Sequence, residues 1–399
     1  MASRRKKRSE PHRLPCGVHP VSLMTEQRAA TSRIPQLELL RVMATIGIFV
    51  FHLWTVIPLS SDVALVGAVL ARLPLLGAVG VIVFNCLTGF VLSAAYLGQH
   101  TQRSIPPTLD FFRHRFGRIC LHYYPTLILW TILWLPPVVQ NQGGLFALLA
   151  FMTHLVFVHT LHASTFFTIV PAFWWLGMLA QFYLVFPWLL RFFEGVGSGR
   201  ACVIACVIPW IAWVVLTRLA SQVPGSTLAT VHYLMYFNLP VRLPEFAIGM
   251  WLASAWNRAA PVVHGRQRTT ARRPWVALVI APLLVSLTLF LLLHRALLDQ
   301  LSRPFDHIYL VFWCVCGILA ILRWPLARRL GSLWLTLDLA GASYGIYLLH
   351  QPLLGYANQS LASLLSPSVR FAVLLIGIGL LCYRAAVWLN ILVYRTVRS

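Results

Sequence analysis

Long apolar segments alternate with short polar loops along almost the whole chain. Many run for close to 20 residues, the length that a helix needs to cross the hydrocarbon core of a bilayer. The eleven segments lie near residues 36–57, 74–97, 119–139, 145–161, 172–190, 201–221, 237–256, 275–294, 307–322, 334–356 and 369–393. The pattern predicts an all-α polytopic membrane protein, with a basic cytoplasmic tail over residues 1–34, disordered in this interpretation, and a transmembrane domain over residues 35–395.

The distribution of arginines between the segments predicts the topology. If every segment crossed the membrane, the arginine-rich loop 257–274 would face the same side as the almost uncharged loop 140–144, which the positive-inside rule disfavours. If segment 145–161 is instead re-entrant or interfacial, all strongly basic loops fall on one side. We therefore predict ten transmembrane helices, one re-entrant or interfacial helix, and cytoplasmic N and C termini.

Composition agrees with this class. Hydrophobic residues make up 59% of the 399 positions and charged residues 11%, which predicts a protein integral to the cell membrane, either inner or plasma. The net charge of +22 lies mostly in loops and ends, so we predict no nucleic-acid partner. The true start is either Met1 or Met24, and the tail has no cleavable signal. The eight cysteines are scattered, and we predict no metal.

The first segment carries three ionisable residues on one helical face. At about 100° per residue, Arg41 and His52 lie about 20° apart, and Glu38 lies about 40° from His52 on the other side. A rise of about 1.5 Å per residue separates Arg41 from His52 by roughly 16 Å. One helix would then carry a cationic inner site and a titratable outer one. The alternative is a local Glu38–Arg41 pair and a core histidine.

Two later segments carry further polar groups at membrane depth. Ser343, Tyr347 and His350 share one face of segment 334–356, and His350 should lie at a depth similar to that of His52. Arg242 and Glu245 form an i,i+3 pair in the outer part of segment 237–256. Such a pair either lines a cavity or fixes helix packing, and the sequence does not decide between these two roles.

Arginines also gather before the third segment, in DFFRHRFGRI. Arg115 and Arg118 are one helical turn apart, and together with Arg113 and Arg41 they would suit phosphate groups that arrive from the cytoplasm. The alternative is that they only orient the chain. At the opposite side, Trp174 lies near the start of segment 172–190, where its ring could stack on a bound molecule; the alternative is an interfacial aromatic belt.

Six blocks along the chain resemble the membrane acyltransferase 3 family: QLELLRVMATIGIFVFH, VIVFNCLTGFVLSAAY, FFRHRFGRI, WWLGMLAQFYLVFP, RLPEFAIGM and ASYGIYLLHQP. The resemblance covers essentially the whole span region. Glu38, Arg41 and His52 match the family's acidic residue, arginine and histidine, and Arg115 and Arg118 match its paired arginines.

This resemblance implies transfer of an acyl group, most often acetyl, from cytoplasmic acyl-CoA as co-substrate to a hydroxyl of a cell-surface or exported polysaccharide or a glycolipid. It implies that the arginines hold the CoA phosphates and that His52 transfers protons, either in direct transfer or through an acyl-enzyme. The partners would be the glycan or glycolipid acceptor, membrane lipids and polysaccharide-assembly proteins.

The chain departs from the family pattern at Leu179, where many members have Glu. The orienting role of that carboxylate would pass to Gln181, Tyr183 or Glu245, or the acceptor differs.

Two other functional classes stay open. A transporter of a glycan precursor or small molecule would use the buried charges as a path, although no convincing internal repeat is seen. A subunit of an envelope complex would use them for helix packing alone.

Overall fold

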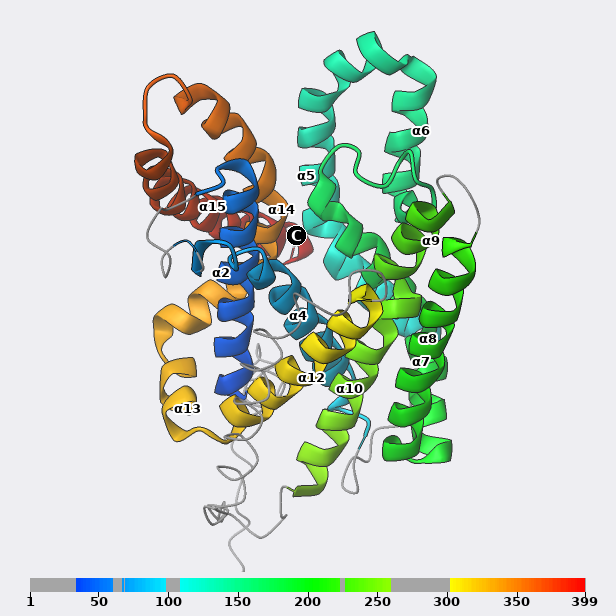
Figure 1. Ribbon diagram of the computed structural model, residues 1–399. Helices are drawn as coiled ribbons and strands as arrows, with labels where there is room; N and C mark the ends of the chain where they lie inside the picture. The colour runs from blue at the N-terminus through cyan, green and yellow to red at the C-terminus, as the bar shows by residue number, and fades with distance from the viewer. Residues whose placement is uncertain are drawn as a thin grey trace, which may run out of the picture.

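The computed structural model describes residues 34–59, 67, 69–97, 108–222, 227–259 and 302–398, and this part of the chain is helical, without strands (Figure 1). Its helices are α2 (Pro35–Val56), α4 (Leu75–Ser93), α5 (Thr108–Gln142), α6 (Gly144–Leu155), η1 (His159–Leu161), η2 (Pro171–Phe173), α7 (Trp174–Val196), α8 (Ser198–Ser221), α9 (Thr227–Tyr236), α10 (Leu239–Ala259), α12 (Ser302–Arg323), α13 (Pro325–Gly331), α14 (Trp334–Leu361) and α15 (Pro367–Arg398). The predicted fold class is confirmed.

Seven helical segments of the described part are long and apolar enough to cross a membrane, and the protein is a multi-pass integral membrane protein. Helix α6 has 12 residues, about 18 Å at 1.5 Å per residue, and is too short to span a core of about 30 Å. It therefore agrees with a re-entrant or interfacial segment. The predicted segment 275–294 and the basic tail lie outside the described residues, and the count of ten and the side of the termini stay predictions.

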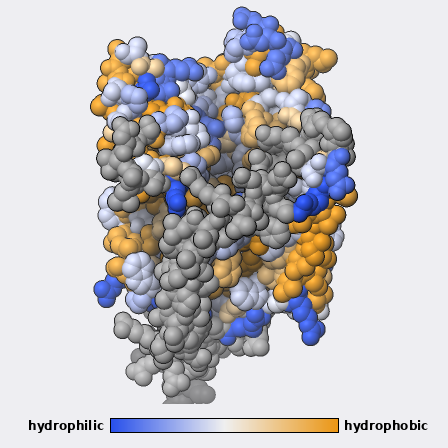
Figure 2. Space-filling view, viewed as in Figure 1, coloured by the Kyte–Doolittle hydropathy of each residue, from blue (hydrophilic) through white to orange (hydrophobic). Residues whose placement is uncertain are grey.

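The outer surface of the helices is apolar, as contact with lipid requires. Helix α8 exposes a row of branched side chains, and the flank near α7 and α8 is largely hydrophobic in Figure 2. The most exposed members of the α8 row are Val203, Ile208 and Ile211. Because these side chains have no protein partner, their burial must come from the hydrocarbon core of the membrane.

Helices α4 and α10 cross in direct backbone contact. A methyl group added at Gly89 would collide with the carbonyl of Phe246, and one added at Gly249 would collide with the carbonyl of Cys86. Small residues at a crossing let two membrane helices approach closely. This contact brings the polar residues one turn before each glycine, Asn85 and Glu245, to the same point in the core.

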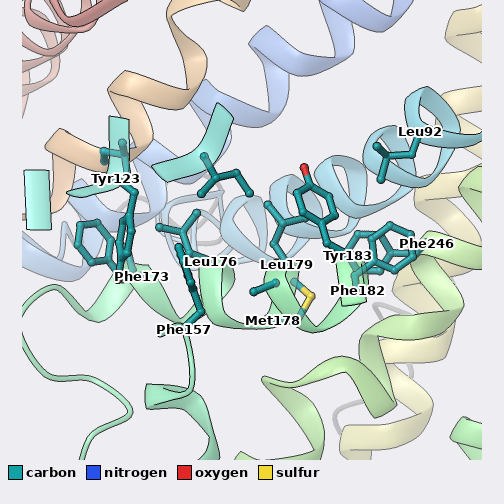
Figure 3. Packing of buried hydrophobic residues seen from close by; sticks show 14 of the residues in the cluster. Leu92, Tyr123, Phe157, Phe173, Leu176, Met178, Leu179, Phe182, Tyr183 and Phe246 are labelled. Atoms are coloured by element: carbon teal, nitrogen blue, oxygen red, sulfur yellow. The ribbon is translucent and has the colours of Figure 1, made fainter. Parts of the chain in front are cut away.

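The larger apolar core lies around α7 and joins it to α5, α10 and α14. Figure 3 shows part of this core beside α7, with Tyr123 and Phe173 at one end and Phe182 and Phe246 at the other. The rings of Phe182 and Phe246 are stacked, with 3.7 Å between their centroids. Phe157 joins this core although its φ is +62°, a conformation that costs a bulky residue free energy. The core thus fixes the segment between α6 and α7 against α14.

Candidate active site

Two histidines from distant parts of the chain meet where α2 crosses α14. The ring centroids of His52 and His350 lie 4.9 Å apart. Gln351, which follows His350, places its Nε2 3.3 Å from His52 Nδ1. Its Oε1 accepts a hydrogen bond of 2.6 Å from the backbone N–H of Ala172. The site is therefore built by α2, α14 and the short helix η2 before α7.

The predicted polar face of α14 also belongs to this site. Tyr347 donates its hydroxyl proton to the carbonyl oxygen of Ala172, so that the Ala172 peptide is held by α14 from both sides. His350 Nδ1 lies 2.8 Å from the Tyr347 carbonyl oxygen, and Ser343 donates to the Ala340 carbonyl oxygen. These contacts leave little rotational freedom to the side chains around the two histidines.

A cavity of about 160 Å³ lies beside this site. It is lined by Arg41, Ile48, Phe84, Thr88, Trp175, Ser343, Tyr344 and Tyr347. A smaller hollow of about 10 Å³ adjoins it and is lined by Thr45, Ile48, Phe49, Phe84, Ile346, Tyr347 and His350. Three residues line both, so the cavity lined by Arg41 and the hollow lined by His350 share part of their walls.

Of the three predicted residues of the first helix, Arg41 lines the larger cavity and His52 packs against His350, which lines the smaller hollow. Arg41 forms an ion pair with Glu38, 2.6 Å between Nη1 and Oε2, and both side chains are partly exposed. The helix between Arg41 and His52 is uninterrupted. The local pair that the sequence left open is therefore present, and Arg41 also lines the cavity.

The arginines of α5 lie on a different element. Arg113 and Arg118 are exposed, and Arg115 is half-buried with its guanidinium 5.9 Å from the ring centroid of Phe111. Helix α5 packs against α6, α7, α14 and α15, whereas α2 packs mainly on α4 and α14. A common phosphate cluster of these arginines with Arg41 stays a prediction.

Arg242 and Glu245 form a fully buried ion pair, 2.9 Å between Nη1 and Oε1. His307 Nε2 lies 3.1 Å from the same Oε1, and Asn85 donates a hydrogen bond of 2.5 Å to Glu245 Oε2. The Arg242 guanidinium also lies 5.5 Å from the Trp174 ring centroid. The pair is thus satisfied within the protein, as the packing alternative requires.

This buried network reaches the cavity through one side chain. Trp175 donates from Nε1 to Asn85 Oδ1 over 2.8 Å, and its ring lies 5.4 Å from that of Tyr347. Trp175 lines the cavity, whereas Arg242, Glu245 and Trp174 are not among its lining residues. Their predicted contact with an acceptor stays a prediction.

Besides Glu245, the other two residues predicted to replace the missing carboxylate, Gln181 and Tyr183, are also packed within the protein. Gln181 donates to Asn238 Oδ1 over 2.5 Å and accepts from the backbone N–H of Leu239 over 3.1 Å. Tyr183 is buried in edge-to-face contact with Phe111 and Phe116. Neither lines the cavity, and their predicted role in orienting an acceptor stays untested.

The sequence interpretation missed three residues of these networks. Gln351 and Asn85 both stand within the motif blocks, but neither carries a charge that would single it out. His307 is an ionisable residue in an apolar segment, which is itself a sign of function or of a buried network. Within the described residues no three His, Cys, Asp or Glu side chains come together in a metal-like group.

Comparisons with known proteins identify the family of this chain. A family model described as an acyltransferase domain matches residues 34–388. The chain is 23% identical over 342 residues to O-acetyltransferase OatA of Staphylococcus aureus strain NCTC 8325 / PS 47, and equally to that of strain COL. The match covers 82% of this chain and 51% of OatA, so the chain spans about half the length of these relatives. No solved structure matches. The matched region holds α2, α14 and both histidines, and the chain belongs to the acyltransferase 3 family.

Proposed function

We propose that the protein transfers an acyl group, acetyl as the first candidate, from cytoplasmic acyl-CoA to a hydroxyl of a cell-surface or exported polysaccharide or a glycolipid. One observation carries the proposal: a cavity lined by Arg41 shares a wall with a hollow lined by His350, whose ring contacts that of His52. The name of the relatives, O-acetyltransferase, supports both the acetyl group and an oxygen acceptor.

The cavity and the hollow suit the two substrates. Arg41 lies near the start of α2, which is cytoplasmic in the predicted topology, and a guanidinium binds phosphate by charge-assisted hydrogen bonds. Arg113, Arg115 and Arg118 would add charge on the same side. The donor's thioester would enter the cavity of about 160 Å³, and its acyl carbon would come to the histidine pair.

Acyl transfer requires a base that activates the acceptor hydroxyl. A sugar hydroxyl is a weak nucleophile at neutral pH, and a neutral imidazole within hydrogen-bond reach raises its reactivity as a general base. The pair His52 and His350 supplies this group, and the polar contacts of Tyr347 and Gln351 hold it in place. The transporter alternative loses support because Arg242 and Glu245 are satisfied by protein groups.

The test is the O-acetyl content of cell-surface and secreted glycans, measured by proton NMR. A deletion strain is complemented with wild type, with His52→Ala, or with the control His162→Ala, which alters an exposed histidine outside the site, all at matched membrane levels. We expect wild type and the control to restore acetylation and His52→Ala to fail. Unchanged acetylation on deletion would refute the proposal, and restoration by His52→Ala would remove His52 from the catalytic centre.

A further inference from the structure

The hydrogen bonds of Gln351 determine which nitrogen of His52 carries the proton. The backbone N–H of Ala172 can only donate, so the amide atom 2.6 Å from it must be the oxygen of Gln351. The amide nitrogen then faces His52 Nδ1 at 3.3 Å. Because an amide NH₂ can only donate, Nδ1 accepts, and the proton of the neutral ring lies on Nε2.

His350 has the opposite tautomer. Its Nδ1 lies 2.8 Å from the Tyr347 carbonyl oxygen, which can only accept, so Nδ1 carries the proton. The lone pair is then on Nε2, which is buried and has no hydrogen-bond partner within the described part of the chain. A buried polar atom without a partner is costly unless a ligand or water satisfies it in the working protein.

The position of His350 suits an incoming hydroxyl. Its side chain is 1% exposed and lines the hollow of about 10 Å³ that adjoins the larger cavity. That volume is about what one water molecule or one hydroxyl group occupies. His52 lies beside it, with its ring centroid 4.9 Å from that of His350.

We propose that His350 is the base that accepts the proton of the acceptor hydroxyl, and that His52 donates a hydrogen bond from Nε2 to the carbonyl oxygen of the acyl group. This division of roles rests on the proposed function. The hydroxyl oxygen bonds to the acyl carbon as its proton passes to His350 Nε2. The carbon–sulfur bond of the thioester then breaks, and His350 returns the proton to the leaving thiolate. Gln351 is a positioning residue that keeps the donor of His52 on Nε2.

The titratable groups near His350 come from α2, α14 and the wall of the larger cavity. They are His52 on α2 and Tyr347 on α14 itself, and the larger cavity is also lined by Tyr344 and Arg41. The segment before α7 presents the uncharged Ala172 peptide, which is already bonded to Gln351 and Tyr347. A hydroxyl proton in the hollow thus has a vacant acceptor in His350 Nε2.

The test compares glutamine substitutions in the purified full-length protein. Acetyl-CoA is the donor, the envelope glycan extract of the deletion strain is the acceptor, and release of free CoA thiol is followed across pH. Glutamine places an N–H near the position of histidine Nε2 but cannot act as a base. We expect His52→Gln to stay within about 10-fold of wild type in kcat and well above His52→Ala, with the acid limb of the pH–rate profile retained. We expect His350→Gln to lower kcat by at least about 100-fold and to abolish the acid limb of the pH–rate profile.

A third variant reverses the tautomer of His52 without removing its ring. In Gln351→Glu the carboxylate accepts from both Ala172 N–H and His52 Nδ1–H, which moves the lone pair to Nε2. We expect kcat to fall about 100-fold, the usual effect of losing one oxyanion donor, with the KM for acetyl-CoA unchanged. A merely structural contact would instead be preserved by glutamate.

The opposite pattern would overturn the inference. His52→Gln would then be as inactive as His52→Ala, His350→Gln would keep the acid limb, and Gln351→Glu would be as active as wild type. Thermal unfolding in detergent identifies any variant that fails to fold, and His350→Asn then replaces His350→Gln. Absence of transfer by the wild-type protein would refute the proposed function instead, so the two failures are distinguishable.

Discussion

Replacement of Glu245 by alanine should destabilise the protein strongly. Glu245 is 0% exposed and is the counter-charge of Arg242, which is 2% exposed. Its second oxygen accepts from Asn85. The substitution leaves a guanidinium buried without a partner, and breaking a buried pair in this way costs about 3–5 kcal/mol. At roughly 2 °C per kcal/mol for a large domain, the melting temperature should fall by about 6–10 °C.

The assay is thermal unfolding of the purified full-length protein in detergent, followed by tryptophan fluorescence. The matched control is Glu194→Ala, since Glu194 is an exposed glutamate near the end of α7. This variant should have the melting temperature of the wild-type protein. The double variant Arg242→Met, Glu245→Met removes both charges and should lose less stability than Glu245→Ala, because no unpaired charge is left.

Activity decides between the two roles of this pair. If Glu245 only supports packing, the surviving folded fraction of Glu245→Ala should keep its KM for acceptor. A melting temperature within about 1 °C of wild type, combined with loss of acyl transfer, would refute the structural argument. Such a result would favour the predicted role of Glu245 in binding an acceptor.

Three further predictions concern helix packing, donor binding and the link between the buried network and the cavity. Gly249→Ala should lower the stability by about 1–3 kcal/mol because the methyl group meets the Cys86 carbonyl; an unchanged melting temperature would contradict the close crossing. Arg41→Gln should raise the KM for acetyl-CoA about 10-fold or more with little change in kcat, and steady-state kinetics with an unchanged KM would exclude a phosphate contact. Trp175→Phe removes the indole N–H that donates to Asn85 Oδ1 and should lower the free energy of unfolding by about 1–3 kcal/mol, as measured by thermal unfolding. An unchanged stability would show that water replaces the indole donor.

The local parts of the fold could be predicted from the sequence. Segment 36–57 corresponds to α2 at Pro35–Val56, and segment 334–356 begins where α14 begins, at Trp334. Both depend on the apolar length and the helical period, which are visible in neighbouring residues. For the same reason, the shared face of Ser343, Tyr347 and His350 follows from the sequence alone.

The contacts that complete the site could not be predicted in this way. Gln351 meets His52 across 299 positions, and Asn85 meets Glu245 across 160. Such pairs depend on which helices pack together. For Asn85 and Glu245 this is the crossing of α4 and α10, where the backbones are in contact at Gly89 and Gly249. The positive φ at Phe157 is equally hidden, because tertiary packing overrides the local preference of a bulky residue.

The unbroken course of α2 has a consequence for how this protein can change. Arg41 and His52 are joined by continuous helix, so their separation is set by residue count and not by the packing of neighbours. One inserted residue would turn His52 by about 100° away from α14, and about four would be needed to bring it back to within about 40° of its direction, at the expense of roughly 6 Å in reach. A change in the length of the donor is therefore accommodated more readily by the side chains of the cavity wall than by this helix.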